Sequence, residues 1–158
     1  MRIGVYAGSF CPVTLGHVDA IAKSAHLVDK LYVVMGVNAQ KKYVIPADAR
    51  LDMLKCALKD LSNVEVVAYD GMMTDYCRQV GATVMIKSIR NAMDTQSVID
   101  ITDVNDNFWD GETVFVVGSK QYRHISSSLV RELAGLKKDF SQYVPKCCLD
   151  EITKYLVK

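Results

Sequence analysis

The residue types best suited to phosphate chemistry lie in one short turn near the start of the chain. Gly8 to His17 reads Gly-Ser-Phe-Cys-Pro-Val-Thr-Leu-Gly-His, and a helical pattern begins directly after it. A helix N-terminus presents free N–H groups and partial positive charge, and Gly16 has no Cβ to block a bulky ligand. The helix dipole disfavours protonation of His17, which still keeps one ring nitrogen as a donor. Thr14, Gly16 and His17 therefore predict a site for phosphate oxygens.

Two common phosphate-binding motifs are absent from this turn. It contains neither Gly-x-Gly-x-x-Gly nor Gly-x-x-x-x-Gly-Lys-Ser/Thr. Cys11 also stands in the turn, but His17 is the only neighbouring base that could activate it, so a catalytic thiol is disfavoured. A lone histidine is most simply a surface or packing residue. The company of Thr14 and Gly16 favours the functional interpretation.

A second cluster of donors precedes a later helical pattern. Ser126, Ser127 and Ser128 follow one another, and Arg131 comes about one helical turn later. A single serine is a good N-cap, which is the simplest interpretation of the run. Three hydroxyl groups and the N–H groups of a helix start exceed what one cap needs, and they suit a chain of phosphates.

Cationic side chains follow two further strand-like runs. Lys41 and Lys42 lie after one of them, and Lys87 and Arg90 lie at the end of another. Solvated surface charge is the ordinary interpretation of such lysines. Arg90 is the stronger candidate, because a guanidinium can bind phosphate through two parallel hydrogen bonds.

The elements that must position these residues alternate between strand and helix. Apolar, often β-branched runs predict five strands, at 3–6, 31–37, 64–68, 83–86 and 113–117. Helical periodicity predicts helices at 18–28, 47–61, 74–80, 91–108, 126–136 and 145–157. The alternation predicts an α/β, Rossmann-like, doubly wound five-stranded parallel sheet with helices on both faces and a helical C-terminal tail. Ligands of such sheets bind beyond the carboxyl ends of the strands, where the candidate residues fall.

Composition limits the class of protein. The length predicts a single domain, residues 1–158, and a net charge of +1 gives no global attraction to nucleic acid. No apolar run is long enough to span a bilayer and no signal-peptide pattern is present, so we expect a cytoplasmic protein without membrane contact. The five cysteines form no Cys-x-x-Cys pair, which fits a reducing compartment. Cys56 and Cys77 are expected to be small, buried hydrophobic side chains.

The motifs together resemble one enzyme family. Thr14-Leu15-Gly16-His17 matches the Thr/His-x-Gly-His motif of a nucleotidyltransferase superfamily. Within it the chain is most similar to bacterial phosphopantetheine adenylyltransferases, from the first turn to the run Ile125-Ser126-Ser127-Ser128. The resemblance implies adenylyl transfer from ATP to 4′-phosphopantetheine, with Mg²⁺, giving dephospho-coenzyme A and pyrophosphate in coenzyme A biosynthesis. It also implies direct in-line attack without a covalent intermediate, a homohexamer, and coenzyme A as a possible feedback ligand.

The resemblance further implies roles for individual residues of this chain. Those acting at the reacting phosphates would be Thr14, His17, Lys41 and Arg90. Those binding the acceptor would be Ser9, Lys41, Met73 and Lys87. Those binding ATP would be Ser9, Phe10, Gly16, His17, Arg90, Tyr122, Ser126, Ser127 and Ser128. No residue is assigned as a metal ligand.

Three departures from the family pattern fall near the two substrates. Cys11 replaces the usual aspartate of the first turn, Lys87-Ser88 replaces Arg-Gly, and Val98 stands where a glutamate associated with ATP binding is usual. Two alternatives therefore stay open. One is a related nucleotidyltransferase with another acceptor such as nicotinamide mononucleotide, because Ile-Ser-Ser-Ser-x-x-Arg resembles the mononucleotide-transfer branch. The other is a catalytically impaired homologue that binds ATP or coenzyme A.

Overall fold

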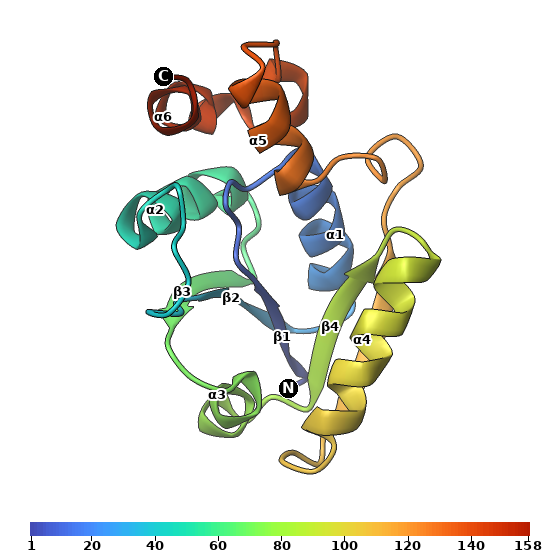
Figure 1. Ribbon diagram of the computed structural model, residues 1–158. Helices are drawn as coiled ribbons and strands as arrows, with labels where there is room; N and C mark the ends of the chain where they lie inside the picture. The colour runs from blue at the N-terminus through green and yellow to red at the C-terminus, as the bar shows by residue number, and fades with distance from the viewer.

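Five parallel strands form one sheet in the structure, a computed structural model that describes all 158 residues (Figure 1). The strands are β1 (Ile3–Gly8), β2 (Lys30–Gly36), β3 (Val64–Tyr69), β4 (Val84–Ile89) and β5 (Glu112–Val117). Their order is β3-β2-β1-β4-β5, and every neighbouring pair is parallel. The strand order therefore reverses between β1 and β4. A ligand crevice is expected beyond the carboxyl ends of the strands at such a reversal.

Helices cover both faces of this sheet. They are α1 (Leu15–Ala25), α2 (Ala47–Leu58), α3 (Met73–Val80), α4 (Ala92–Asn105), α5 (Ser127–Gly135) and α6 (Leu149–Leu156), with two 3₁₀ turns, η1 (Ser141–Tyr143) and η2 (Lys146–Cys148). α1, α2, α5 and α6 share the larger hydrophobic core on one face, whereas α3 packs in a smaller core on the other. The C-terminal tail stacks above α2 and α1 (Figure 1). The predicted fold class is confirmed.

The alternation of side chains along the central strands separates the two layers. Val5 belongs to the smaller core and Tyr6 to the larger one. On β4, Met85 belongs to the smaller core and Ile86 to the larger one. Successive side chains of a strand point to opposite faces. The same rule decides which residues at the strand ends share a cavity.

Local signals set the helix boundaries. α1 begins at Leu15, three residues before the predicted start, because the Thr14 side chain caps it. α3 ends at Gly81, whose φ of +69° is the left-handed conformation typical of a glycine C-cap. The predicted last helix begins with η2 and becomes regular only from Leu149. None of the helices is both long and apolar enough to cross a membrane.

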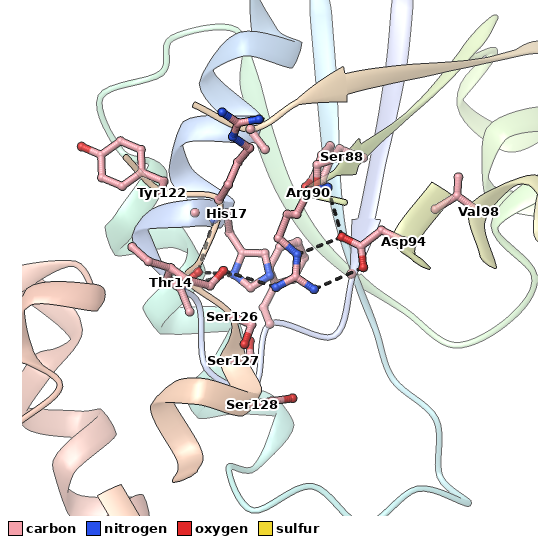
Figure 2. A pocket seen from close by; sticks show the side chains of 18 of the residues that line it. Thr14, His17, Ser88, Arg90, Asp94, Val98, Tyr122, Ser126, Ser127 and Ser128 are labelled. Atoms are coloured by element: carbon pink, nitrogen blue, oxygen red, sulfur yellow. Dashed lines mark hydrogen bonds and ion pairs between the residues drawn. The ribbon is translucent and has the colours of Figure 1, made fainter. Parts of the chain in front are cut away.

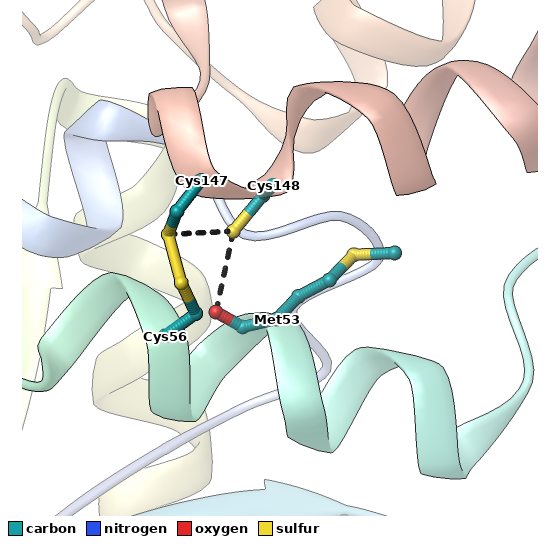
Figure 3. The surroundings of a disulfide bond; sticks show 4 residues. All are labelled: Met53, Cys56, Cys147 and Cys148. Atoms are coloured by element: carbon teal, nitrogen blue, oxygen red, sulfur yellow. Dashed lines mark hydrogen bonds between the residues drawn. A yellow bond between two sulfur atoms is a disulfide. The ribbon is translucent and has the colours of Figure 1, made fainter.

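A disulfide bond joins α2 to the C-terminal tail (Figure 3). Cys56 of α2 pairs with Cys147 of η2, with 6.4 Å between their Cα atoms. The interpretation of Cys56 as a simple buried hydrophobic side chain is therefore wrong. Its partner lies 91 positions away in the sequence, so no local pattern indicated the pairing. Cys11, Cys77 and Cys148 are free and buried, as expected for Cys77. Burial raises the pKa of the Cys148 thiol to about 11, so it stays protonated at neutral pH.

Candidate active site

The first turn fixes His17 in one orientation. Thr14 adopts an extended conformation before α1, and its hydroxyl accepts a hydrogen bond from the His17 backbone N–H at 3.3 Å. The Thr14 backbone N–H in turn donates to His17 Nδ1 at 3.0 Å, which completes a capping box. Because Nδ1 accepts, the proton of the neutral ring sits on Nε2. His17 therefore offers one N–H donor to the cavity that its side chain lines.

The electrostatic surroundings keep His17 neutral. Burial, and to a smaller extent the positive charge of Arg90, lower the pKa of His17 to about 4. At pH 7 the ring is thus a hydrogen-bond donor without a formal charge. This is the protonation state suited to contacting an oxygen without trapping it as an ion pair.

Arg90 follows β4 and projects toward His17 (Figure 2). Its Nε donates to Asp94 Oδ2 at 2.9 Å and its Nη2 donates to Asp94 Oδ1 at 3.3 Å, so the guanidinium is held through a fork. Asp94 also accepts from the Arg90 backbone N–H at 3.1 Å. Sequence reasoning missed Asp94, although a carboxylate four residues after an arginine at a helix start was a readable signal.

The serine run does more than cap α5. Ser126 is the N-cap, and its hydroxyl accepts from the Leu129 N–H at 3.1 Å. The Ser127 hydroxyl instead donates to the Pro12 carbonyl at 2.7 Å. Arg131 donates to the Cys11 carbonyl at 2.6 Å and to the Ser128 hydroxyl at 3.1 Å. Ser126 therefore caps α5, while Ser127 and Arg131 bind the start of this helix to the first turn.

A loop between β5 and α5 lies across the start of α1. Asp19 of α1 accepts from the Ser119 backbone N–H at 2.8 Å and from its hydroxyl at 2.7 Å. A Cβ on Gly16 would lie 3.3 Å from the Ile125 carbonyl oxygen and 3.4 Å from that of Tyr122. Gly16 thus makes room for this loop, whereas the sequence alone suggested room for a ligand.

One cavity of about 400 Å³ collects most of the predicted nucleotide-binding residues (Figure 2). Those that line it are Phe10, Thr14, Gly16, His17, Arg90, Tyr122, Ser126, Ser127 and Ser128. Asp94 is the only carboxylate in its wall, and Arg90 occupies it. Val98, one helical turn after Asp94, contributes an apolar patch to the same wall. We call this the His17 cavity.

A second cavity, of about 390 Å³, collects the predicted acceptor-binding residues Ser9 and Lys41. Lys42 and Arg131 add positive charge, and no carboxylate lines it. We call it the Lys41 cavity. Ser127 and Arg131 line both cavities, which therefore adjoin at the start of α5. The arrangement suits two anionic ligands that meet beside the first turn.

Two predicted residues line neither cavity. Met73 is the first residue of α3 and packs against the smaller core. Lys87 precedes Ser88 on β4, and because Ser88 lines the His17 cavity, Lys87 faces the opposite side of the sheet. Burial lowers the pKa of the Lys87 ammonium, in line with a position against the α3 layer.

The Cys11 side chain is largely buried, although Cys11 borders the Lys41 cavity. Its side chain is 6% exposed and belongs to the larger hydrophobic core. Cys11 contributes its backbone carbonyl, which accepts a hydrogen bond from Arg131. The turn therefore presents hydrogen-bond donors rather than a nucleophile, and the cations beside it come from other elements. This arrangement fits direct transfer between two bound phosphates.

Comparison with known proteins agrees with this geometry. The Cytidylyltransferase-like family model matches residues 5–133. A phosphopantetheine adenylyltransferase of Streptococcus mutans is 43% identical over 97% of this chain and 93% of its own length. One from Lachnoclostridium phytofermentans is 37% identical over 96% and 94%, respectively. A crystal structure from Vibrio parahaemolyticus, assigned as a nicotinate-nucleotide adenylyltransferase, matches with a TM-score of 0.68 and 18% identity over 99% of both chains, which supports the fold. The chain belongs to the phosphopantetheine adenylyltransferase family, within the cytidylyltransferase-like proteins.

Proposed function

We propose that the chain transfers the adenylyl group of ATP to 4′-phosphopantetheine, giving dephospho-coenzyme A and pyrophosphate in coenzyme A biosynthesis. The observation that carries the proposal is the pair of adjoining cavities, one with His17 and Arg90 and the other with Lys41. A phosphate in the Lys41 cavity would lie next to a triphosphate in the His17 cavity. The relatives named as phosphopantetheine adenylyltransferases support the same acceptor.

The residues of the His17 cavity bind the nucleotide in this proposal. Tyr122 lies at the adenine end, and Arg90 with the serine run 126–128 holds the β- and γ-phosphates. Ser9 and Phe10 complete the turn beneath the α-phosphate. Val98 supplies no carboxylate to the cavity. The Arg90 guanidinium is nevertheless held in place, because Asp94 accepts two of its hydrogen bonds.

The transfer itself is a single displacement. A phosphate oxygen of the acceptor attacks the α-phosphorus, a new P–O bond forms, and the bond to the β-phosphate oxygen breaks. The electron pair of that bond leaves with pyrophosphate, so no protein atom becomes covalently linked. His17 Nε2–H and the Thr14 hydroxyl stabilise the α-phosphate oxygens, and Lys41 balances charge between the two phosphates. Such transfers depend on positioning and charge stabilisation more than on a nucleophile.

Met73 and Lys87 contact the acceptor farther from the reacting centre in this proposal. Neither lines the Lys41 cavity. The pantetheine arm would therefore reach the face of the sheet that α3 covers, where Met73 packs and which Lys87 faces.

In this proposal Mg²⁺ binds together with the triphosphate of ATP. No group of three or more His, Cys, Asp or Glu side chains is placed to hold a metal ion. Asp94, the one carboxylate of the His17 cavity, is occupied by Arg90. Mg²⁺ usually keeps several waters and binds through substrate phosphates, so we treat the substrate as MgATP and assign the ion no protein ligand.

A pyrophosphate-release assay with MgATP and 4′-phosphopantetheine tests the proposal. We expect turnover with this acceptor and a much lower kcat/KM with nicotinamide mononucleotide. Turnover with nicotinamide mononucleotide but not with 4′-phosphopantetheine would show that the proposed acceptor is wrong. Tight ATP or coenzyme A binding by calorimetry without pyrophosphate release would identify an impaired homologue instead.

A homo-oligomer, a hexamer by family resemblance, accompanies this function. α4, the turn that follows it and β5 expose apolar side chains that the single chain leaves uncovered: Met93, Ile101, Val104, Phe108 and Val117. Exposed apolar side chains of this size and number are compatible with an interface between copies of the chain. Light scattering after size exclusion would give the subunit number. Coenzyme A as a feedback ligand and a cytoplasmic location are part of the same proposal, and inhibition assays and cell fractionation test them.

A further inference from the structure

Arg50 is the most deeply buried charged side chain of the protein. It lies in the first turn of α2 and is 1% exposed. Its Nη1 donates to the Ser9 carbonyl at 2.7 Å, and its Nε donates to the Ile45 carbonyl at 3.2 Å. The guanidinium also lies over the ring of Tyr43, 3.9 Å from the ring centre.

No carboxylate neutralises this guanidinium. The five salt bridges of the structure involve other residues, and the partners of Arg50 are two carbonyls and an aromatic face. Burial of an unpaired charge costs stability, because carbonyl groups replace the hydration of an ion incompletely. A buried cation without a counter-ion also leaves positive potential in the space next to it.

The space next to Arg50 is the Lys41 cavity. Ser9, whose carbonyl accepts from Arg50, lines it, and so does Tyr43, against which the guanidinium stacks. Ser9 belongs to the turn after β1, and Tyr43 belongs to the loop after β2 that carries Lys41. Arg50 thus connects two walls of one cavity that come from different strand ends. No other side chain bonds to the Ser9 carbonyl.

We propose that Arg50 is a positioning residue for the phosphate acceptor. It fixes the Ser9 turn and the Lys41 loop at a set separation, and its charge strengthens the attraction of the Lys41 cavity for a phosphate dianion. The phosphate itself completes the charge balance that the protein leaves open. This inference rests on the proposed function, because it assigns the Lys41 cavity to the acceptor.

Two substitutions separate the position of the guanidinium from its charge. Arg50→Met removes both, and Arg50→Lys keeps the charge but loses the fork. We expect Arg50→Met to raise the KM for 4′-phosphopantetheine about tenfold or more, with the KM for ATP changed less than about twofold. Arg50→Lys should recover part of the acceptor KM. Arg78→Met is the matched control, because Arg78 is exposed on α3 and lines neither cavity.

A binding measurement makes the inference independent of turnover. Inorganic phosphate should raise the Tm of the wild type and of the Arg78→Met variant, and raise that of Arg50→Met much less. If the wild type releases no pyrophosphate yet shows this difference, the proposed function fails and the role of Arg50 in anion binding stands.

Other outcomes would overturn the assignment of Arg50. If Arg50→Met lowers only the Tm of the free protein and leaves both KM values and the phosphate-induced shift unchanged, Arg50 is purely structural. Equal increases in the KM for ATP and for the acceptor would show a general loss of site structure. Failure of Arg50→Lys to recover any acceptor affinity or any of the phosphate-induced Tm shift would exclude the contribution of charge.

Discussion

His17 and Arg90 show how single residues of the site are prepared before a ligand arrives. The capping box orients the imidazole and leaves Nε2–H as its donor. The Asp94 carboxylate holds the Arg90 guanidinium through two hydrogen bonds in the wall of the same cavity. Both groups are fixed by neighbours within four positions in sequence. Donors that are already oriented need no reorganisation when charge shifts in the transition state.

Replacement of His17 separates its donor from its ring. We expect His17→Ala to lower kcat by about 10²–10³, because one preorganised donor to the reacting phosphate is lost. His17→Asn should lose less, since its side chain can both accept from Thr14 and donate to the ligand. Steady-state pyrophosphate release measures both variants. A His17→Ala enzyme with near-normal kcat would contradict the role given to Nε2–H.

Acidification should destabilise the protein through His17. Its pKa is about 4 in the folded protein, against 6.5 for an ordinary histidine, so the unfolded chain binds the extra proton between these values. The contribution to the free energy of unfolding is complete above pH 6.5 and falls toward pH 4, by up to about 1.4 kcal/mol per pH unit. Urea unfolding at several pH values measures this slope. The His17→Asn variant should show a shallower one, and identical slopes would count against the neutral, buried ring.

Arg90→Lys tests the fork rather than the charge. A lysine keeps one positive charge but cannot bind Asp94 and a phosphate through a planar pair of N–H groups. We expect kcat/KM for ATP to fall at least about tenfold. The Arg90–Asp94 pair is partly exposed, so the Tm should change little. An unchanged kcat/KM would show that charge alone suffices.

At the scale of elements, the close approach of α1 and the loop before α5 decides the shape of the His17 cavity. Gly16 permits this approach, and Asp19 secures it through Ser119. These contacts join residues about a hundred positions apart. The loop thereby places Tyr122 and the serine run 126–128 beside the start of α1, in the wall of the His17 cavity.

Gly16→Ala should disturb that contact. The new Cβ would lie 3.3 Å from the Ile125 carbonyl, so the loop backbone must shift by a few tenths of an ångström. We expect a loss of about 1 kcal/mol in the free energy of unfolding and a raised KM for ATP. Gly135→Ala is the control, because nothing lies within 4 Å of its Cβ position. Equal stability of the two variants would argue against a tight contact at Gly16.

Local patterns predicted the elements better than the contacts between them. Periodicity located all five strands and six helices, because each strand is a compact apolar run and most of the helices bury apolar side chains on one side. The rule for parallel sheets then brought His17, Arg90 and Ser127 to one edge. Arg50 and Asp19 escaped notice, because their importance depends on partners that only the folded chain supplies. Asp94 was missed although its spacing from Arg90 is local.

At the scale of the whole molecule, a disulfide bond connects the C-terminal tail to α2, the helix whose Arg50 lies next to the Lys41 cavity. Cys56 and Cys147 link α2 to η2, and α2 also carries Arg50. In a reducing cytosol such a bridge would be present as two thiols, since glutathione and thioredoxin keep most cytosolic cysteines reduced. The link is therefore a property of the oxidised protein.

A thiol count tests the bridge directly. Protein purified without reductant and then denatured should react with three equivalents of a thiol reagent, from Cys11, Cys77 and Cys148. After reduction it should react with five, the number of cysteines in the chain. The Cys147→Ser variant should react with four under both conditions. Five reactive thiols in the untreated wild type would show that the bridge does not form.

The bonds from α5 to the first turn also bear on the order in which the protein is made. Ser127 to Pro12 and Arg131 to Cys11 connect residues 115 and 120 positions apart. A ribosome synthesises the Thr14–His17 turn before α5, and the wall opposite that turn exists only after α5 has been translated and has left the exit tunnel. A nascent chain that stalls before Ser126 therefore carries His17 without an enclosed nucleotide site, so ATP can stabilise the fold only after α5 has emerged.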